Sequence, residues 1–312
     1  MWQREWVLGA TSRTSTMLLI FFVCSCANLP DAMWSHARAG IVLNPSSNAT
    51  VIYAGASAAN FDLEQDGAYR LMANGRYGGG TGAAFQSSLY GANINNLWVA
   101  ENGNLNFGTT GDGGFYSFPL SSSNAALRVS PFGDDVFMLD GLDNKILDHS
   151  VAGSYLAITW QDIRLFNDVP AGGPVPMETM TTQVIWFEKD MQIQGFDFKK
   201  DDIAFGYSGF SGGTIDATIG VGKDANVFTP IPGDADGLIS STQNQSNLIP
   251  WGDKEFLLFR PQAGGASYLG TRESFTAVPE PSSLLMALSA GGLVLTKWRR
   301  KFLGQLVRKR HV

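Results

Sequence analysis

Residues 96–108 read NLWVAENGNLNFG, and this stretch predicts the fold class of the chain. Two runs of β-forming residues, 97–100 and 105–107, stand on either side of a polar segment that contains Asn102 and Gly103. Asn-Gly pairs are typical of tight hairpin turns, because both residues accept positive φ angles at low cost. The stretch therefore predicts an antiparallel β-hairpin.

Short strands of the same kind continue along the chain. Apolar residues alternate with others at residues 155–160, 203–207 and 215–221, with the period of two that half-buried strands show. The sequence contains no heptad repeat and no long amphipathic helix pattern. We expect an all-β fold, an antiparallel β-sandwich-like single domain, flanked by an N-terminal signal helix and a C-terminal transmembrane helix.

Two further strands are expected around a polar turn at residues 188–190. The first covers residues 182–187 and the second covers residues 191–198. Within the second strand the apolar parity changes at Gly195, which predicts a β-bulge there. Residues 233–246 are polar and poor in β-formers, so they are expected to form a loop.

The composition suits an exported β-protein better than a helical enzyme. Of 312 residues, 36 are glycine and only 16% are charged, whereas globular chains average about 7% glycine and about 25% charged residues. Residues 41–279 contain 25 acidic and 12 basic residues, a net charge of −13. An acidic body of this kind repels phosphate backbones, which argues against nucleic acid as a partner.

The N-terminus has the pattern of a secretory signal peptide, which we assign to residues 1–39. Arg4 and Arg13 precede the apolar run MLLIFFV, and cleavage is expected after either Ala27 or Ala39. Both cysteines of the chain fall inside this segment. The mature body is therefore expected to contain no disulfide, no thiol nucleophile and no thiol metal ligand.

The C-terminus, residues 278–312, has three consecutive parts. Pro279, Glu280 and Pro281 come first, an apolar run follows, and Arg299 and Arg300 begin a basic tail. The apolar run is short of the ~20 residues of a comfortable membrane span, and the arginines would stay in the cytoplasm by the positive-inside rule. The order predicts a transmembrane helix that anchors the chain.

This order resembles the PEP-CTERM sorting signal of Gram-negative bacteria. In that family the motif is recognised by an exosortase, a membrane transpeptidase that processes the tail. The resemblance implies an exported protein that is held transiently in the inner membrane by its C-terminal helix. After processing, the protein would reach the cell surface or the extracellular matrix.

The body between the two signals, residues 40–277, resembles the nidogen-like extracellular domain. The segments that carry the resemblance occur in the family's order: NLWVAENGNLNFG (96–108), SFPL (117–120), VSPFGDDV (129–136), AITWQDI (157–163) and TQVIWF (182–187). Gly133 departs from the aromatic residue usual after Pro-Phe. The resemblance implies an extracellular matrix or adhesion context, and it supplies no catalytic residues.

Few residues of the body have the chemistry of a catalytic site. His149 is its only histidine, which argues against a zinc site and leaves one candidate base for a triad, in what reads as a polar turn. Asp134, Asp135 and Asp162 are the candidates for glycosidase chemistry, which needs only two well-spaced acids. The alternative is that Asp134 and Asp135 close a turn by accepting backbone N–H bonds.

Calcium is the one cofactor that the sequence suggests, and the signal is weak. Asp234 and Asp236 lie in the segment GDADG, which offers carboxylate oxygens in a loop. The later ligands and the glycine position of an EF-hand are missing, so this is at most an irregular calcium site.

We therefore expect an exported, envelope-sorted, non-catalytic protein that serves as a structural or adhesive part of the extracellular polymeric matrix, as in a biofilm. Its expected partners are exosortase and then an extracellular polysaccharide or a surface protein. The alternative is a carbohydrate-binding module or a carbohydrate-active hydrolase on the same β-sandwich.

Overall fold

The computed structural model describes the body of the chain with gaps: residues 49–54, 68–107, 119–121, 127–134, 136–137, 144–165, 179–210, 215–240, 243, 245–251 and 254–275. The expected signal helix, transmembrane helix and basic tail lie outside these residues, as does Asp135. Within the described part, no helix has the length and apolar character needed to cross a membrane.

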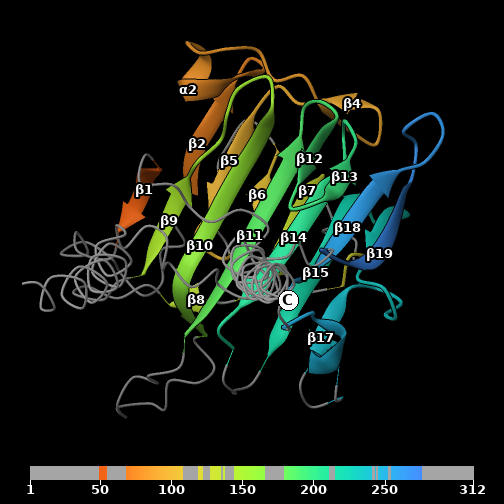
Figure 1. Ribbon diagram of the computed structural model, residues 1–312. Coiled ribbons are helices and arrows are strands. Elements are labelled where there is room, and N and C mark those ends of the chain that lie inside the picture. The colour runs from red at the N-terminus through yellow and green to blue at the C-terminus, as the bar shows by residue number, and fades with distance from the viewer. Residues whose placement is uncertain are drawn as a thin grey trace, which may run out of the picture. The chain divides into compact units, whose positions relative to one another are not determined.

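The described chain is mostly β-strand with almost no helix, arranged mainly in two antiparallel sheets (Figure 1). The first sheet has the order β1-β9-β10-β11-β14-β18-β19, with β8 beside β10. Its strands are β1 (Thr50–Ala54), β8 (Val136–Phe137), β9 (Lys145–Asp148), β10 (Tyr155–Leu165), β11 (Met180–Phe187), β14 (Ile203–Ser208), β18 (Glu255–Pro261) and β19 (Tyr268–Ser274).

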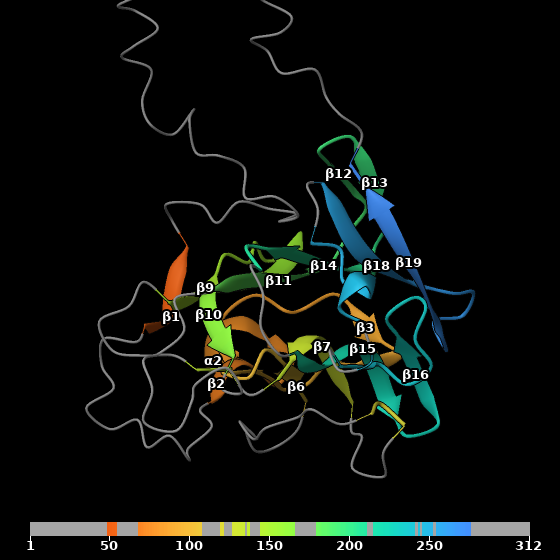
Figure 2. The same ribbon diagram turned by 90° about the horizontal axis from the view of Figure 1, so that it is seen from below.

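The second sheet has the order β16-β15-β7-β6-β5-β2, with β17 beside β15. Its strands are β2 (Ala68–Ala73), β5 (Leu97–Ala100), β6 (Leu105–Asn106), β7 (Arg128–Gly133), β15 (Asp216–Asp224), β16 (Val227–Pro230) and β17 (Leu238–Ser240). Seen from below, the two sheets form separate layers (Figure 2). The all-β, sandwich-like expectation is confirmed.

The main core lies between the sheets, because alternate residues of their strands point into it. Three runs follow the expected period of two, and all their members are fully buried: Leu156, Ile158 and Trp160 of β10; Ile203, Phe205 and Tyr207 of β14; and Ala217, Ile219 and Val221 of β15. The Trp160 indole N–H donates to the carbonyl of Ala100 on the opposite sheet (2.9 Å), so this buried nitrogen has a hydrogen-bond partner across the core.

The hairpin expected from residues 96–108 is present as β5 and β6, which pair Val99 with Leu105. Gly103 has a φ of 72°, and a Cβ atom there would collide with the carbonyl of Phe132. Asn102 contributes differently from the expectation: it is buried, and its Oδ1 accepts the N–H of Val136 at 3.1 Å. Asn102 therefore also ties the hairpin turn to the start of β8.

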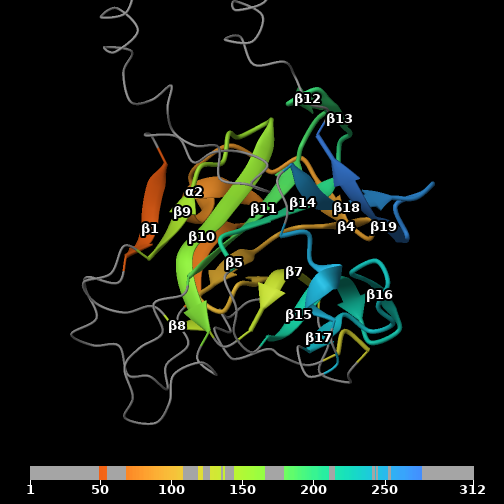
Figure 3. The same ribbon diagram turned by 60° about the horizontal axis from the view of Figure 1, so that its bottom comes forward.

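A second apolar cluster lies on the face of the first sheet that points away from the second sheet. We call it the outer cluster; it contains Ala157, Ile185, Phe187, Ile193, Phe198, Ala204, Phe256, Leu258 and Phe275. The hairpin of β12 (Met191–Ile193) and β13 (Phe196–Phe198) covers it, and this hairpin stands outside the sandwich in Figure 3.

Two expectations about local structure were wrong. Gly195 is no bulge: β12 and β13 pair with each other, and Gln194 (φ 50°) and Gly195 (φ 82°) form the turn between them. A two-residue hairpin loop with two positive φ angles reverses the chain, which also shifts the apolar parity. Residues 233–246 contain strand β17, which pairs with β15 and leads to the 3-10 helix η5 (Ser246–Leu248).

Two small elements complete the described fold at one end of the sandwich. They are the short helix α2 (Tyr77–Gly80) and the pair of β3 (Ser88–Leu89) with β4 (Ala92–Asn93). Tyr77 and Leu89 of these elements are buried in the main core.

Candidate functional site

Asp134, the first acid of the predicted glycosidase candidates, is fully buried at the end of β7. Its Oδ2 accepts the backbone N–H of Asp216 at 3.3 Å. A carboxylate that accepts a backbone N–H in this way holds two chain segments together. Asp134 thus accepts a backbone N–H, as expected, but the donor is 82 residues away in β15, so this bond links two segments instead of closing a turn.

Asp162, the other candidate, lies in β10 where the strand register shifts between Trp160 and Ile163. Its φ is 54°, its N–H donates to Thr181 Oγ1 (3.2 Å) and its Oδ2 accepts from Gln161 Nε2 (3.0 Å). Asp134 follows a strand of the second sheet, whereas Asp162 belongs to the first. Each carboxylate thus has its own set of partners on a separate sheet.

His149 follows β9 and is more enclosed than the expected polar turn. Its Nε2 lies 2.9 Å from the Thr159 hydroxyl. Burial lowers the pKa of His149 from its usual 6.5 to about 4, and Asp148 opposes this shift only partly. The imidazole is therefore neutral at physiological pH, and the adjacent Ser150 hydroxyl accepts the N–H of Ala157 (2.9 Å).

The calcium candidates shape the loop that leads into β17. Asp234 Oδ1 accepts the N–H groups of Asp236 (3.0 Å) and Gly237 (2.6 Å), and its Oδ2 accepts from Gln245 Nε2 (2.9 Å). Asp236 Oδ1 accepts the N–H of Leu238 (3.1 Å). Among the residues that the structure describes, no group of three or more His, Cys, Asp or Glu side chains is placed to hold a metal. A calcium role for this loop stays a prediction.

Glu188 was expected only as part of a polar turn, and it is a buried junction of three segments. Its Oε1 accepts from the Tyr77 hydroxyl (2.6 Å) and the N–H of Gly153 (3.2 Å), and its Oε2 accepts the N–H of Gln86 (2.8 Å). Burial, together with the bond to Glu188, raises the pKa of Tyr77 above its usual value. No sequence signal could reveal this junction, because its partners lie 35 to 111 residues away along the chain.

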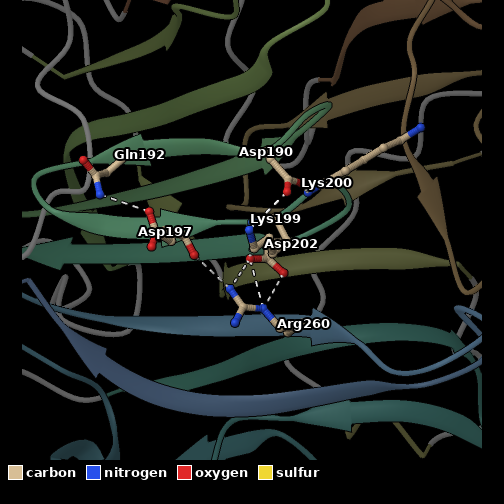
Figure 4. A network of polar contacts seen from close by, with 7 residues as sticks. All are labelled: Asp190, Gln192, Asp197, Lys199, Lys200, Asp202 and Arg260. Atoms are coloured by element: carbon tan, nitrogen blue, oxygen red, sulfur yellow. Dashed lines mark hydrogen bonds and ion pairs between the residues drawn. The ribbon is translucent and has the colours of Figure 1, made fainter.

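A second polar network, also missed, fastens the β12–β13 hairpin to β18 (Figure 4). Asp202 is fully buried and binds the Arg260 guanidinium through Nε (2.9 Å) and Nη2 (2.6 Å). Arg260 Nη2 also donates to the carbonyl of Asp197 (3.2 Å), at the hairpin's second strand. The bond to Asp202 raises the pKa of Arg260, so this guanidinium is a permanent cation.

Beside the β12–β13 hairpin, Asp190 binds the end of β13. Its Oδ1 accepts the N–H of Lys200 (2.9 Å) and its Oδ2 accepts from Lys199 Nζ (3.1 Å). In Figure 4 the Lys200 side chain points away from this network. These bonds close the hairpin over the outer cluster.

The described chain ends at Phe275, which follows β19 and is 5% exposed in the outer cluster. Its N–H donates to the carbonyl of Lys254 (2.8 Å), and its ring stacks on Phe256 with centroids 4.6 Å apart. The predicted sorting residues Pro279, Glu280, Pro281, Arg299 and Arg300 lie beyond the described part of the chain.

Comparison with known families matches residues 277–301 to the PEP-CTERM protein-sorting motif. The matched segment includes all five predicted sorting residues and begins two residues after Phe275. No curated protein and no solved structure matches the chain. The motif implies an exported, membrane-passing protein that exosortase recognises and processes and that is sorted to the cell surface.

Proposed function

We propose that this chain is a non-catalytic structural or adhesive protein of the extracellular polymeric matrix, delivered to the cell surface by the exosortase route. The single observation that carries the proposal is the PEP-CTERM motif, which directly follows a folded all-β body. Export through the N-terminal signal would leave the C-terminal helix in the inner membrane of a Gram-negative cell. Exosortase would then process the tail and release the body.

The non-catalytic part of the proposal is supported by what the candidate residues do. Asp134 and Asp162 bind backbone and neighbouring side chains on separate sheets. His149 is neutral at physiological pH and in contact with a threonine hydroxyl. The contacts of these side chains stabilise the fold, which agrees with a body that binds its partners through its surface and catalyses no reaction.

The adhesive part of the proposal rests on the resemblance of the body to the nidogen-like extracellular domain. That resemblance supports a matrix or adhesion context, in which an extracellular polysaccharide or a surface protein would be the partner. The net charge of −13 over residues 41–279 favours polymers that are neutral or basic over nucleic acid.

A carbohydrate-binding module is the second candidate, and one surface feature favours it. Leu97 and Val99 point into the core, so Trp98 between them faces outward from the second sheet. The Arg70 guanidinium lies 5.4 Å from the Trp98 ring centre and donates to Asn96 Oδ1 (2.7 Å). The Trp98 ring is half-buried and the exposed Arg70 guanidinium lies over it, so the guanidinium and the Asn96 amide are the planar polar groups that offer hydrogen bonds to a sugar here.

Binding of the purified mature protein to the host's own extracellular polymer tests the proposal. We expect it to be retained on that polymer and to release no sugars from it. If the single substitution Trp98→Ala abolishes retention of the protein on the polymer, the carbohydrate-binding module is favoured. Release of sugars by the wild-type protein would contradict the non-catalytic role.

A further inference from the structure

Strand β19 is held on the first sheet mainly through its two ends. It lies at the edge of the sheet and, in the described chain, pairs with β18 alone (Figure 1). Tyr268 at its start is 7% exposed, and its hydroxyl donates to the carbonyl of Ser88 (3.1 Å). The residues from Leu269, 53% exposed, to Ser274 are all half-buried or exposed. They contribute ladder hydrogen bonds and little apolar burial.

Phe275 is the anchor at the other end. It is the first buried side chain after Tyr268, and it is fixed both by its stacking on Phe256 and by its bond to the carbonyl of Lys254. If the ring of Phe275 leaves the outer cluster, the rest of the strand is held by its backbone ladder with β18 and by the exposed contacts of Arg272 with Glu255 (2.7 Å) and the carbonyl of Asn247 (3.4 Å). Segments of this kind open locally at low free energy.

The position of Phe275 limits the distance between the last packed residue of the body and the start of the sorting motif at Pro279. Pro279 follows four residues later, and a fully extended chain spans at most about 3.6 Å per residue, so the distance is at most about 14 Å. A compact body of this size has a radius of gyration of about 17 Å. Pro279 can therefore lie no farther from Phe275 than about this radius of gyration.

Detachment of β19 would change this distance. If the strand opened back to Leu269, ten residues would separate the last attached residue from Pro279, a reach of about 35 Å. The attached and detached forms thus differ by more than twofold in the reach of the motif. A longer reach leaves a membrane-embedded enzyme more room between the motif and the folded body.

We propose that Phe275 restrains sorting: while its ring is packed in the outer cluster, Pro279 is kept within about 14 Å of the end of β19, and exosortase gains access to the motif when the end of β19 detaches. The restraint acts on access to the motif and leaves the processing chemistry unchanged. It regulates the site used in the proposed function and therefore rests on that function.

A pulse-chase measurement of tail processing in the native host, on the full-length protein, tests the restraint. Phe275→Ala should shorten the processing half-time at least about tenfold, because burial of the ring no longer opposes opening. Leu269→Ala is the matched control: it removes an exposed side chain from the same strand and should be processed at the wild-type rate.

A second variant keeps the body intact in case Phe275→Ala is degraded. An insertion of eight Gly and Ser residues after Thr276 leaves Phe275 in place and extends the reach of Pro279 to about 43 Å. It should also accelerate processing, and a wild-type half-time for this variant would overturn the proposal. Normal processing after replacement of Pro279, Glu280 and Pro281 would instead contradict the proposed function itself.

Discussion

The Tyr77 hydroxyl donates a 2.6 Å hydrogen bond to Glu188 Oε1, across 111 residues of sequence, inside a site where the carboxylate is 3% exposed. Glu188 also accepts the backbone N–H groups of Gln86 and Gly153. One side chain thereby joins the segment after α2, the turn between β9 and β10, and the end of β11. The loops at this end of the sandwich depend on it.

Tyr77→Phe should lower the free energy of unfolding by about 1–3 kcal/mol, because a buried carboxylate oxygen loses its strongest donor. Urea denaturation of the processed protein measures this loss. Tyr69→Phe is the control, since Tyr69 is 46% exposed, and it should change stability by less than about 0.5 kcal/mol. Equal effects of the two substitutions would contradict a structural role for the Tyr77–Glu188 bond.

Arg260→Ala should destabilise the β12–β13 hairpin by leaving the buried Asp202 carboxylate without its cation. We expect a loss of about 2 kcal/mol, below the 3–5 kcal/mol of a fully buried pair, because the Arg260 side chain is 38% exposed. Hydrogen exchange should show the loss first in β12 and β13. Arg272→Ala removes an exposed ion pair with Glu255 (2.7 Å) between β19 and β18 and should cost about 0.5 kcal/mol or less.

Acid should weaken the fold through His149. Its pKa is about 4 in the folded protein and 6.5 in the unfolded chain, so the unfolded state binds the proton first as the pH falls. Burial of the neutral imidazole contributes its full stability above pH 6.5, and this contribution is lost as the pH falls to about 4. The free energy of unfolding should fall by on the order of 3 kcal/mol across this window.

The free energy of unfolding, measured between pH 7 and pH 4 for wild type and for His149→Gln, checks this effect. His149 is the only histidine between residues 40 and 277, so the difference between the two proteins isolates its titration from that of the carboxylates. The wild type should lose more stability across this window. Parallel pH curves would show that His149 keeps its ordinary pKa.

Replacing Asp134 and Asp135 together with asparagine should cost about 1 kcal/mol, the value of an ordinary hydrogen bond, with matrix binding retained. Asparagine keeps the side-chain size and an acceptor for the N–H of Asp216. A glycan-cleaving activity in the wild type that falls by orders of magnitude in this variant would establish the hydrolase alternative.

Features that depend on neighbouring residues could be predicted from the sequence. The β5–β6 hairpin and the alternation in β10, β14 and β15 follow from local turn chemistry and from the period of two. Gly195 shows the limit of such patterns. A bulge and a tight turn both shift the apolar parity, and only the pairing of β12 with β13 distinguishes them.

Contacts between distant segments could not be predicted. Glu188 was expected in a polar turn and Asp202 lies between two expected strands, yet each is buried and bonded to side chains far away along the chain. The anchoring of Phe275 likewise depends on Phe256 and the hairpin beyond it. The sorting residues were predictable for the opposite reason: their order along the chain is itself the signal, and the family match covers residues 277–301.

The most direct test of the proposed function is tail processing after Pro279, Glu280 and Pro281 are replaced together with alanine in the native host. Export should continue, because the N-terminal signal is untouched, and the unprocessed protein should accumulate in the inner membrane fraction. Immunoblots of membrane and extracellular fractions measure both forms. We expect the processed form to disappear from the extracellular fraction; equal amounts of processed protein from the variant and the wild type would rule out the exosortase route.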